Sequence, residues 1–99
     1  MKKSSFNKLE LFIPVVIRVH GKNHPEMKEV GLLFEKIKQK VAKGGNDELG
    51  DEFKQLREIT NHYTVPNGVC ESYEAVYHML AESDEGHMKM NDHIKQHKT

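Results

Sequence analysis

The sequence has no tryptophan, one cysteine and three prolines, and it lacks any long apolar run. A single cysteine, Cys70, excludes an internal disulfide framework and is typical of a reducing compartment. No apolar stretch approaches the ~18 residues of a membrane span, and the first residues lack the apolar segment of a signal peptide. We therefore expect a cytoplasmic protein that does not bind membranes.

The chain also lacks an excess of charge of either sign, but its charges are unevenly distributed. Residues 1–44 contain ten basic and four acidic residues, a net charge of +6. Residues 45–88 contain two basic and ten acidic residues, a net charge of −8, and residues 89–99 carry +2. A basic half followed by an acidic half predicts two halves that attract each other within one fold. It argues against nucleic-acid binding, because no uniform basic surface remains to contact phosphates.

Apolar residues recur at helical spacing in the first segment, residues 8–20. One helical face of this segment carries Leu9, Phe12, Ile13, Val16 and Ile17. Pro14 and the β-branched run from Val15 to Ile17 weaken the helix prediction, because proline lacks the amide hydrogen and β-branched residues favour strands. A short strand is therefore the alternative for this segment.

Three further segments show the same helical periodicity. The second ends at Gly44-Gly45, the third ends before a turn at residues 65–68, and the last begins at Val69. Short connections predict antiparallel neighbours, so we expect residues 1–99 to form one domain, an all-α, up-down four-helix bundle. The first helix should be short and the last should overhang the bundle, with residues 1–6 and 95–99 frayed.

Three stretches of the chain resemble one known family. The first is Val19 to Met27 (VHGKNHPEM), continued by Glu29, Val30, Leu33 and Phe34. The second is Gly50, residues 56–64 (LREITNHYT) and Pro66, and the third is Cys70 with Tyr73, Ala75, Tyr77 and Leu80. Together they cover about residues 15–82 and resemble the hemerythrin-like (HHE) domain of the iron–sulfur cluster repair di-iron proteins. The resemblance implies a bundle that holds two irons through histidines and carboxylates, a role in nitrosative stress, and an iron–sulfur protein as client.

The chain departs from the family's ligand pattern at one end of the bundle. The first helix begins after the position at which the family has its first histidine ligand. The second helix ends at Gly44-Gly45, before any His-x-x-x-Glu motif of the kind that the family has there. Asn46 stands where the third helix would have its histidine, and His97 stands where the last helix would have its glutamate. Because these positions share one end of an up-down bundle, the chain resembles a family member shortened at its metal-binding end.

The candidate metal ligands that remain all lie near the C-terminus. They are His87, on the inward stripe of the last segment, and His93 and His97, which share a helix face at i, i+4. Asp84, three residues before His87, is placed to orient its imidazole. One helix cannot supply the several N and O ligands that each of two irons needs, so we expect a degenerate or absent di-iron site. The other four histidines, His20, His24, His62 and His78, are expected in turns or on the surface.

The sequence thus predicts a small, non-enzymatic hemerythrin-like protein that binds residual iron at most and has no other cofactor or catalytic residue. One alternative is a metal-free interaction module that forms a homodimer through its C-terminal helix. A di-iron enzyme assembled between two subunits also stays open.

Overall fold

Pro14 lies inside a helix rather than a strand. The computed structural model describes the backbone of residues 3–45 and 48–98 and the side chains of residues 4–45 and 48–87. Within these ranges the chain forms four helices and no strand: α1 (Lys3–His20), α2 (Glu26–Ala42), α3 (Gly50–Ile59) and α4 (Glu71–Lys98). The all-α prediction is confirmed, and the strand alternative for residues 8–20 is wrong. Burial of Leu9, Ile13 and Val16 on one face of α1 outweighs the local preference of its β-branched residues.

In place of the short first helix that the sequence predicts, α1 has 18 residues, one more than α2. The helix begins at Lys3 because its first turns also find a packing partner. The ring of Phe6 lies 5.3 Å from the ring of Phe34 in α2. Residues 3–6 and 95–98 are helical, so the expected fraying of both chain ends stays a prediction.

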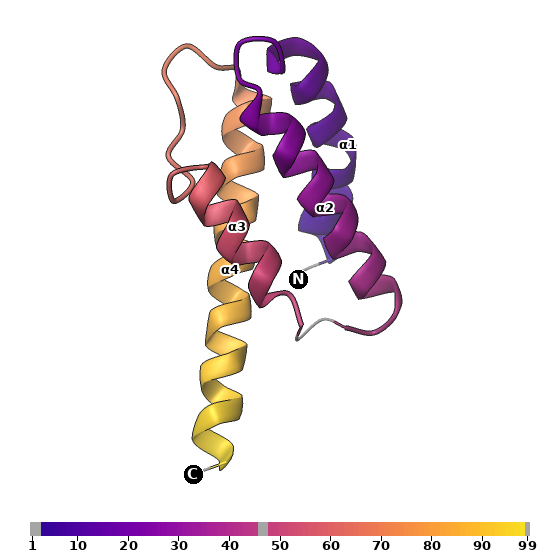
Figure 1. Cartoon of the computed structure of the whole chain (residues 1–99), viewed down its shortest axis with the longest axis vertical. Helices are drawn as coiled ribbons and strands as arrows, with labels where there is room; N and C mark the ends of the chain where they lie inside the picture. Colours follow the sequence, from indigo (N-terminus) through magenta and orange to yellow (C-terminus); the bar gives the residue numbers. More distant parts are fainter. Residues whose placement is uncertain (1–2, 46–47, 99) are drawn as a thin grey trace.

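Figure 1 shows an up-down arrangement in which each helix runs antiparallel to the next. Helix α1 packs against α4 and α2, and α2 packs against α3. The two basic helices therefore pack against the two acidic ones, as the charge distribution predicts. Helix α4 has 28 residues, and its C-terminal part extends beyond the rest of the bundle, as expected. No helix in the described part of the chain is both long and apolar enough to cross a membrane.

One apolar core joins all four helices. Its largest fully buried side chains are Tyr73, Tyr77 and Phe53. A fully buried side chain of this kind stabilises the fold by about 1.5–3 kcal/mol relative to the exposed state. The other buried apolar residues are Leu9, Ile13, Val16, Met27, Val30, Leu33, Phe34, Ile37, Leu49, Leu56, Val76 and Leu80. Phe53 of α3 and Tyr77 of α4 both belong to this core, which brings polar side chains of the two helices close together.

Candidate functional site

The inward stripe of α4 turns polar after Leu80, as the sequence predicts. Val76, Tyr77 and Leu80 are buried in the core, and the same face continues with Ser83, Asp84 and His87, which are also buried. The stripe lies beside α3: Asp84 contacts Arg57 near the end of α3 and Tyr63 in the turn after it, and the ring of His87 lies against Phe53 near its start. A buried polar group costs free energy unless it has a partner, so the partners define the chemistry of this site.

Asp84 is held by two side chains that come from outside α4. Its side chain is 4% exposed, and its Oδ2 atom lies 2.9 Å from Nε of Arg57 in α3. The hydroxyl of Tyr63 donates a hydrogen bond of 2.6 Å to the same oxygen. Burial, followed by this bond to the Asp84 carboxylate, raises the pKa of Tyr63 well above its ordinary value. The carboxylate charge is therefore opposed by a guanidinium and bonded by a neutral phenol.

The turn after α3 brings Tyr63 to Asp84. Asn61, His62 and Tyr63 have positive φ angles of 51°, 57° and 61°, a left-handed conformation that L-residues adopt at a cost. The amide of His62 donates to the Arg57 carbonyl at 2.8 Å, and the amide of Tyr63 donates to Oγ1 of Thr60 at 2.9 Å. Three consecutive left-handed residues persist only where such surrounding contacts hold them.

Glu52, in the first turn of α3, is the second buried carboxylate of this region. Its side chain is 7% exposed, and Nζ of Lys40 in α2 lies 3.0 Å from one carboxylate oxygen and 3.1 Å from the other. The same ammonium group donates a hydrogen bond of 2.9 Å to the Glu48 carbonyl. Both buried carboxylates of this region are thus paired with a cation from a neighbouring helix.

His87 faces inward, as predicted from its place on the stripe. It is 7% exposed, and its ring lies 5.3 Å from the ring of Phe53 with an interplanar angle of 44°. His93 and His97 belong to α4, but their side chains lie outside the described residues. Among the described side chains, no group of three or more His, Cys, Asp or Glu residues is arranged to hold a metal ion.

A second polar cluster, which the sequence does not predict, lies at the opposite end of the bundle. The rings of His20 and His24 lie 5.5 Å and 5.4 Å from the ring of Tyr73, both edge to face. The Tyr73 hydroxyl donates to Oε1 of Glu26 at 3.0 Å, and Nδ1 of His24 lies 3.1 Å from that same oxygen. The Tyr77 hydroxyl lies 3.2 Å from that of Tyr73. Burial, then these hydrogen bonds, raises the pKa of Tyr73 well above its ordinary value.

The four remaining histidines follow the sequence prediction in part. His62 and His78 are exposed. His20 and His24 lie at the α1–α2 turn as expected, but their rings also pack against Tyr73. The i, i+4 spacing of Tyr73 and Tyr77 could have indicated this cluster, because it puts both hydroxyls on one face of α4. The helical pattern predicted only that the two tyrosines are core residues.

Neither polar cluster presents an activated nucleophile. Most of their buried charges and hydroxyls are paired within the cluster, which is typical of groups that fix the packing of helices, although Oδ1 of Asp84 has no hydrogen-bond partner among the described residues. No family model matches this sequence, and no solved structure matches this fold.

Proposed function

We propose that the chain is a small hemerythrin-like protein related to the iron–sulfur cluster repair di-iron proteins, with a degenerate metal site. The proposal rests on the resemblance over about residues 15–82 and agrees with the four-helix fold. In this proposal the protein acts in the cytoplasm, is not an enzyme, and meets an iron–sulfur protein as client.

The ion pairs of the two buried carboxylates, Glu52 and Asp84, carry the proposal of a degenerate site. A di-iron centre needs several carboxylate oxygens for its metals, and of the four oxygens here only Oδ1 of Asp84 has no hydrogen-bond or ion-pair partner among the described residues. Lys40 pairs with the first at 3.0 Å and Arg57 with the second at 2.9 Å. A metal at either carboxylate would meet a fixed positive charge within a few ångströms, so these residues do not fit a di-iron centre.

Residual iron binding is proposed at His87, His93 and His97. The i, i+4 spacing of the last two residues puts both on one face of α4, and a neutral imidazole is a common iron ligand. Such a single-helix site supplies few ligands, so we expect weak binding of at most one iron per chain.

Iron analysis of protein loaded and purified under anaerobic, reducing conditions tests this proposal. We expect at most one iron per chain, and loss of that iron when His87, His93 and His97 are all changed to alanine. His78→Ala is the matched control, because His78 is an exposed histidine of α4 outside the proposed set. Two irons per chain with the absorption band of an oxo-bridge would contradict the degenerate site.

A metal-free interaction module is the second candidate, and the extension of α4 beyond the bundle favours it (Figure 1). It predicts a homodimer that persists in chelator and dissociates on truncation after Glu85. A chain that is monomeric before and after truncation would exclude it. A di-iron site shared between two subunits instead predicts dimers that need metal, and loss of metal when His93 and His97 are changed together.

A further inference from the structure

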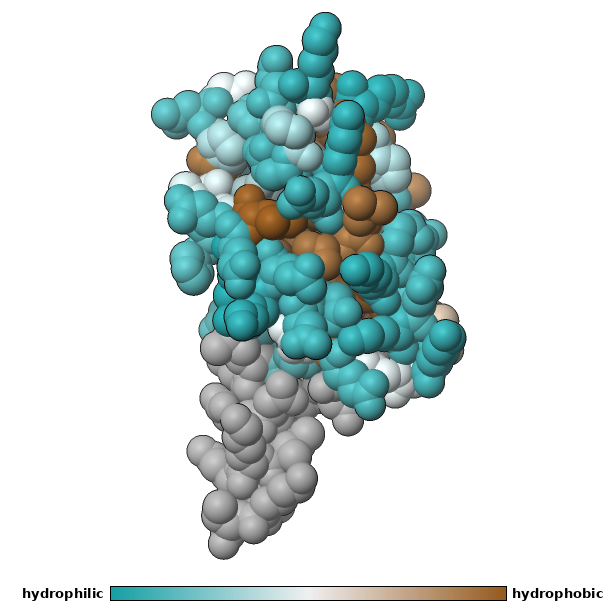
Figure 2. Space-filling view, in the orientation of Figure 1, coloured by the Kyte–Doolittle hydropathy of each residue, from teal (hydrophilic) through white to brown (hydrophobic). Residues whose placement is uncertain are grey.

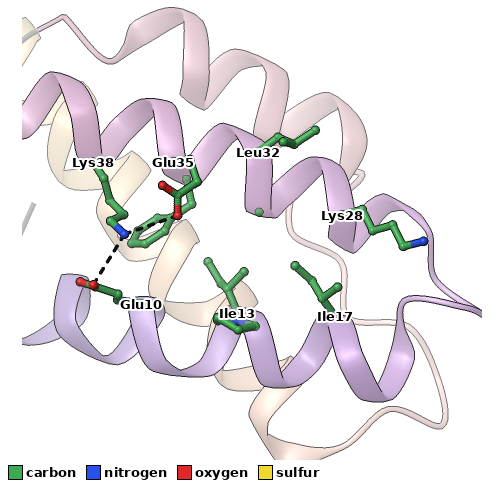
Figure 3. Close-up of a pocket in the computed structure, with 10 residues that line it drawn as sticks. Glu10, Ile13, Ile17, Lys28, Leu32, Glu35 and Lys38 are labelled. Atoms are coloured by element: carbon green, nitrogen blue, oxygen red, sulfur yellow. Dashed lines mark hydrogen bonds and ion pairs between the residues drawn. The ribbon is translucent and has the colours of Figure 1, made fainter.

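An open apolar groove of about 690 Å³ lies between α1 and α2 (Figure 3). Its floor comes from α1, where Ile13 and Ile17 point toward α2, and its rim carries Leu32, whose side chain is 67% exposed. Gly31 lies beside this leucine, and a Cβ atom there would come within 2.8 Å of Cδ1 of Ile17. Because Gly31 has no side chain, Ile17 stays partly exposed beside it, whereas Ile13 is 3% exposed and belongs to the core. Figure 2 shows several hydrophobic patches among hydrophilic residues on this face, some of them near its middle, where α2 lies.

The two ends of the groove carry opposite charge. At one end, Nζ of Lys38 lies 3.6 Å from Glu10 and 3.4 Å from Glu35, so two carboxylates share one cation (Figure 3). At the other end stands Lys28, which lines the groove and has no ion pair within the described part of the chain. One end therefore has a net charge of −1 and the other a net charge of +1.

We propose that this groove is the interface between two copies of the chain. Lys28 and Glu35 lie seven positions apart on α2, about 10 Å along the helix axis, and their midpoint falls between Gly31 and Leu32. A two-fold axis through that midpoint places Lys28 of one protomer opposite Glu35 of its partner, and the reverse. The same axis places each Leu32 over the Gly31 gap of the other copy, against Ile17.

A second copy fits this groove better than an apolar small molecule or an unrelated helix. A surface with complementary charges at equal distances from its centre is complementary to itself after a two-fold rotation, which is the requirement for a symmetric dimer. A single apolar ligand would satisfy neither end of the groove. Two helix faces form a small interface, so we expect a reversible dimer with a dissociation constant in the micromolar range or weaker.

Charge reversal in pairs provides the sharpest test of this interface. We expect Lys28→Glu alone and Glu35→Lys alone each to weaken dimerisation at least tenfold, because each puts like charges opposite one another. The double variant restores both contacts with reversed sign, so its dissociation constant should return to within threefold of that of the unchanged chain. Sedimentation equilibrium of the full chain over 5–500 µM, in about 50 mM salt, measures all four proteins.

Leu32→Lys tests the apolar centre of the interface. We expect a monomer over the same concentration range, because two lysines would meet at the two-fold axis. Leu11→Lys is the matched control: Leu11 is 68% exposed, lies on α1 and does not line the groove. Circular dichroism of each variant verifies that the helices remain folded.

The proposal is overturned if the unchanged chain is monomeric throughout, if the double charge reversal fails to restore the dimer, or if Leu11→Lys disrupts it as strongly as Leu32→Lys. A dimer that survives Leu32→Lys but dissociates on truncation after Glu85 would assign the interface to the end of α4. That result would also overturn the groove interface while supporting the second candidate function. Iron content does not enter any of these readouts, so the failure of one proposal is distinguishable from failure of the other.

Discussion

Asp84 shows how single residues hold this bundle together. A carboxylate that is only 4% exposed depends on its partners, because an unpaired buried charge costs several kcal/mol. The Arg57 side chain is one-third exposed, so solvent screens part of this ion pair and reduces its contribution to the stability of the fold. Tyr63 adds a short hydrogen bond from a residue 21 positions away. The three side chains tie α3, its following turn and α4 to one another.

A double-mutant cycle on Asp84 and Tyr63 measures this coupling. We expect Asp84→Asn to lower the free energy of unfolding by about 2 kcal/mol, because it leaves the Arg57 guanidinium half-buried and unpaired. Tyr63→Phe should lower it by about 1 kcal/mol through loss of the hydrogen bond. Urea denaturation gives both values, and the double variant should lose less than the two effects combined. Strictly additive losses would contradict a shared network, and exposed Glu82→Gln should change little.

All three tyrosines have raised pKa values, and this predicts an alkaline limit to stability. Burial is the main cause for Tyr63, Tyr73 and Tyr77 alike. Since each pKa is higher in the folded chain than the value of about 10 in the unfolded chain, the folded state binds more protons above that pH. The stabilisation is fully present below pH 10 and falls above it, by about 1.4 kcal/mol per pH unit for each tyrosine. Phenolate absorbance near 295 nm should rise only together with loss of helix, and ionisation of folded protein near pH 10 would contradict this prediction.

At the scale of the element, the turn after α3 is the most strained part of the described backbone. Its three consecutive residues with positive φ include His62, at 57°, whose side chain is exposed and whose amide bonds to the Arg57 carbonyl. A β-carbon in this region costs roughly 1–2 kcal/mol, which glycine avoids.

His62→Gly is therefore expected to stabilise the chain. We expect a gain of about 0.5–1 kcal/mol in the free energy of unfolding, since the greater freedom of glycine in the unfolded chain offsets part of the relieved strain. His78→Gly, at an exposed position inside α4, should instead destabilise by about 1 kcal/mol, as glycine does within helices. Thermal denaturation of both variants shows whether each substitution raises or lowers the stability of the chain. A loss of stability in both would argue against the left-handed turn.

Helical periodicity was enough to predict four helices and the inward polar stripe of α4. Each of these features depends on residues three or four positions apart, so it can be predicted from the sequence pattern alone. The partners of Asp84 could not be predicted in this way, because Arg57 and Tyr63 approach it only after α3 packs against α4. The start of α1 was missed for a similar reason, since its first turns are fixed by contact between Phe6 and Phe34.

At the scale of the whole molecule, the basic helices α1 and α2 face the acidic helices α3 and α4. Residues 1–44 carry a net charge of +6 and residues 45–88 a net charge of −8. The contacts of α1 with α4 and of α2 with α3 bring these opposite charges together (Figure 1). The Lys40–Glu52 pair at 3.0 Å is a direct ion pair between α2 and α3.

This arrangement predicts that added salt destabilises the fold. The screening length falls from about 10 Å at 0.1 M salt to about 3 Å at 1 M, so the attraction between the two helix pairs weakens while the apolar core is little affected. We expect the free energy of unfolding to fall by about 1 kcal/mol between 0.05 and 0.5 M NaCl. Urea is the denaturant to use, because guanidinium would itself screen the charges. Lys36→Glu, which reverses one exposed charge on the basic half, should reduce the salt dependence. Stability that rises with NaCl would mean that repulsion within each half outweighs attraction between the halves.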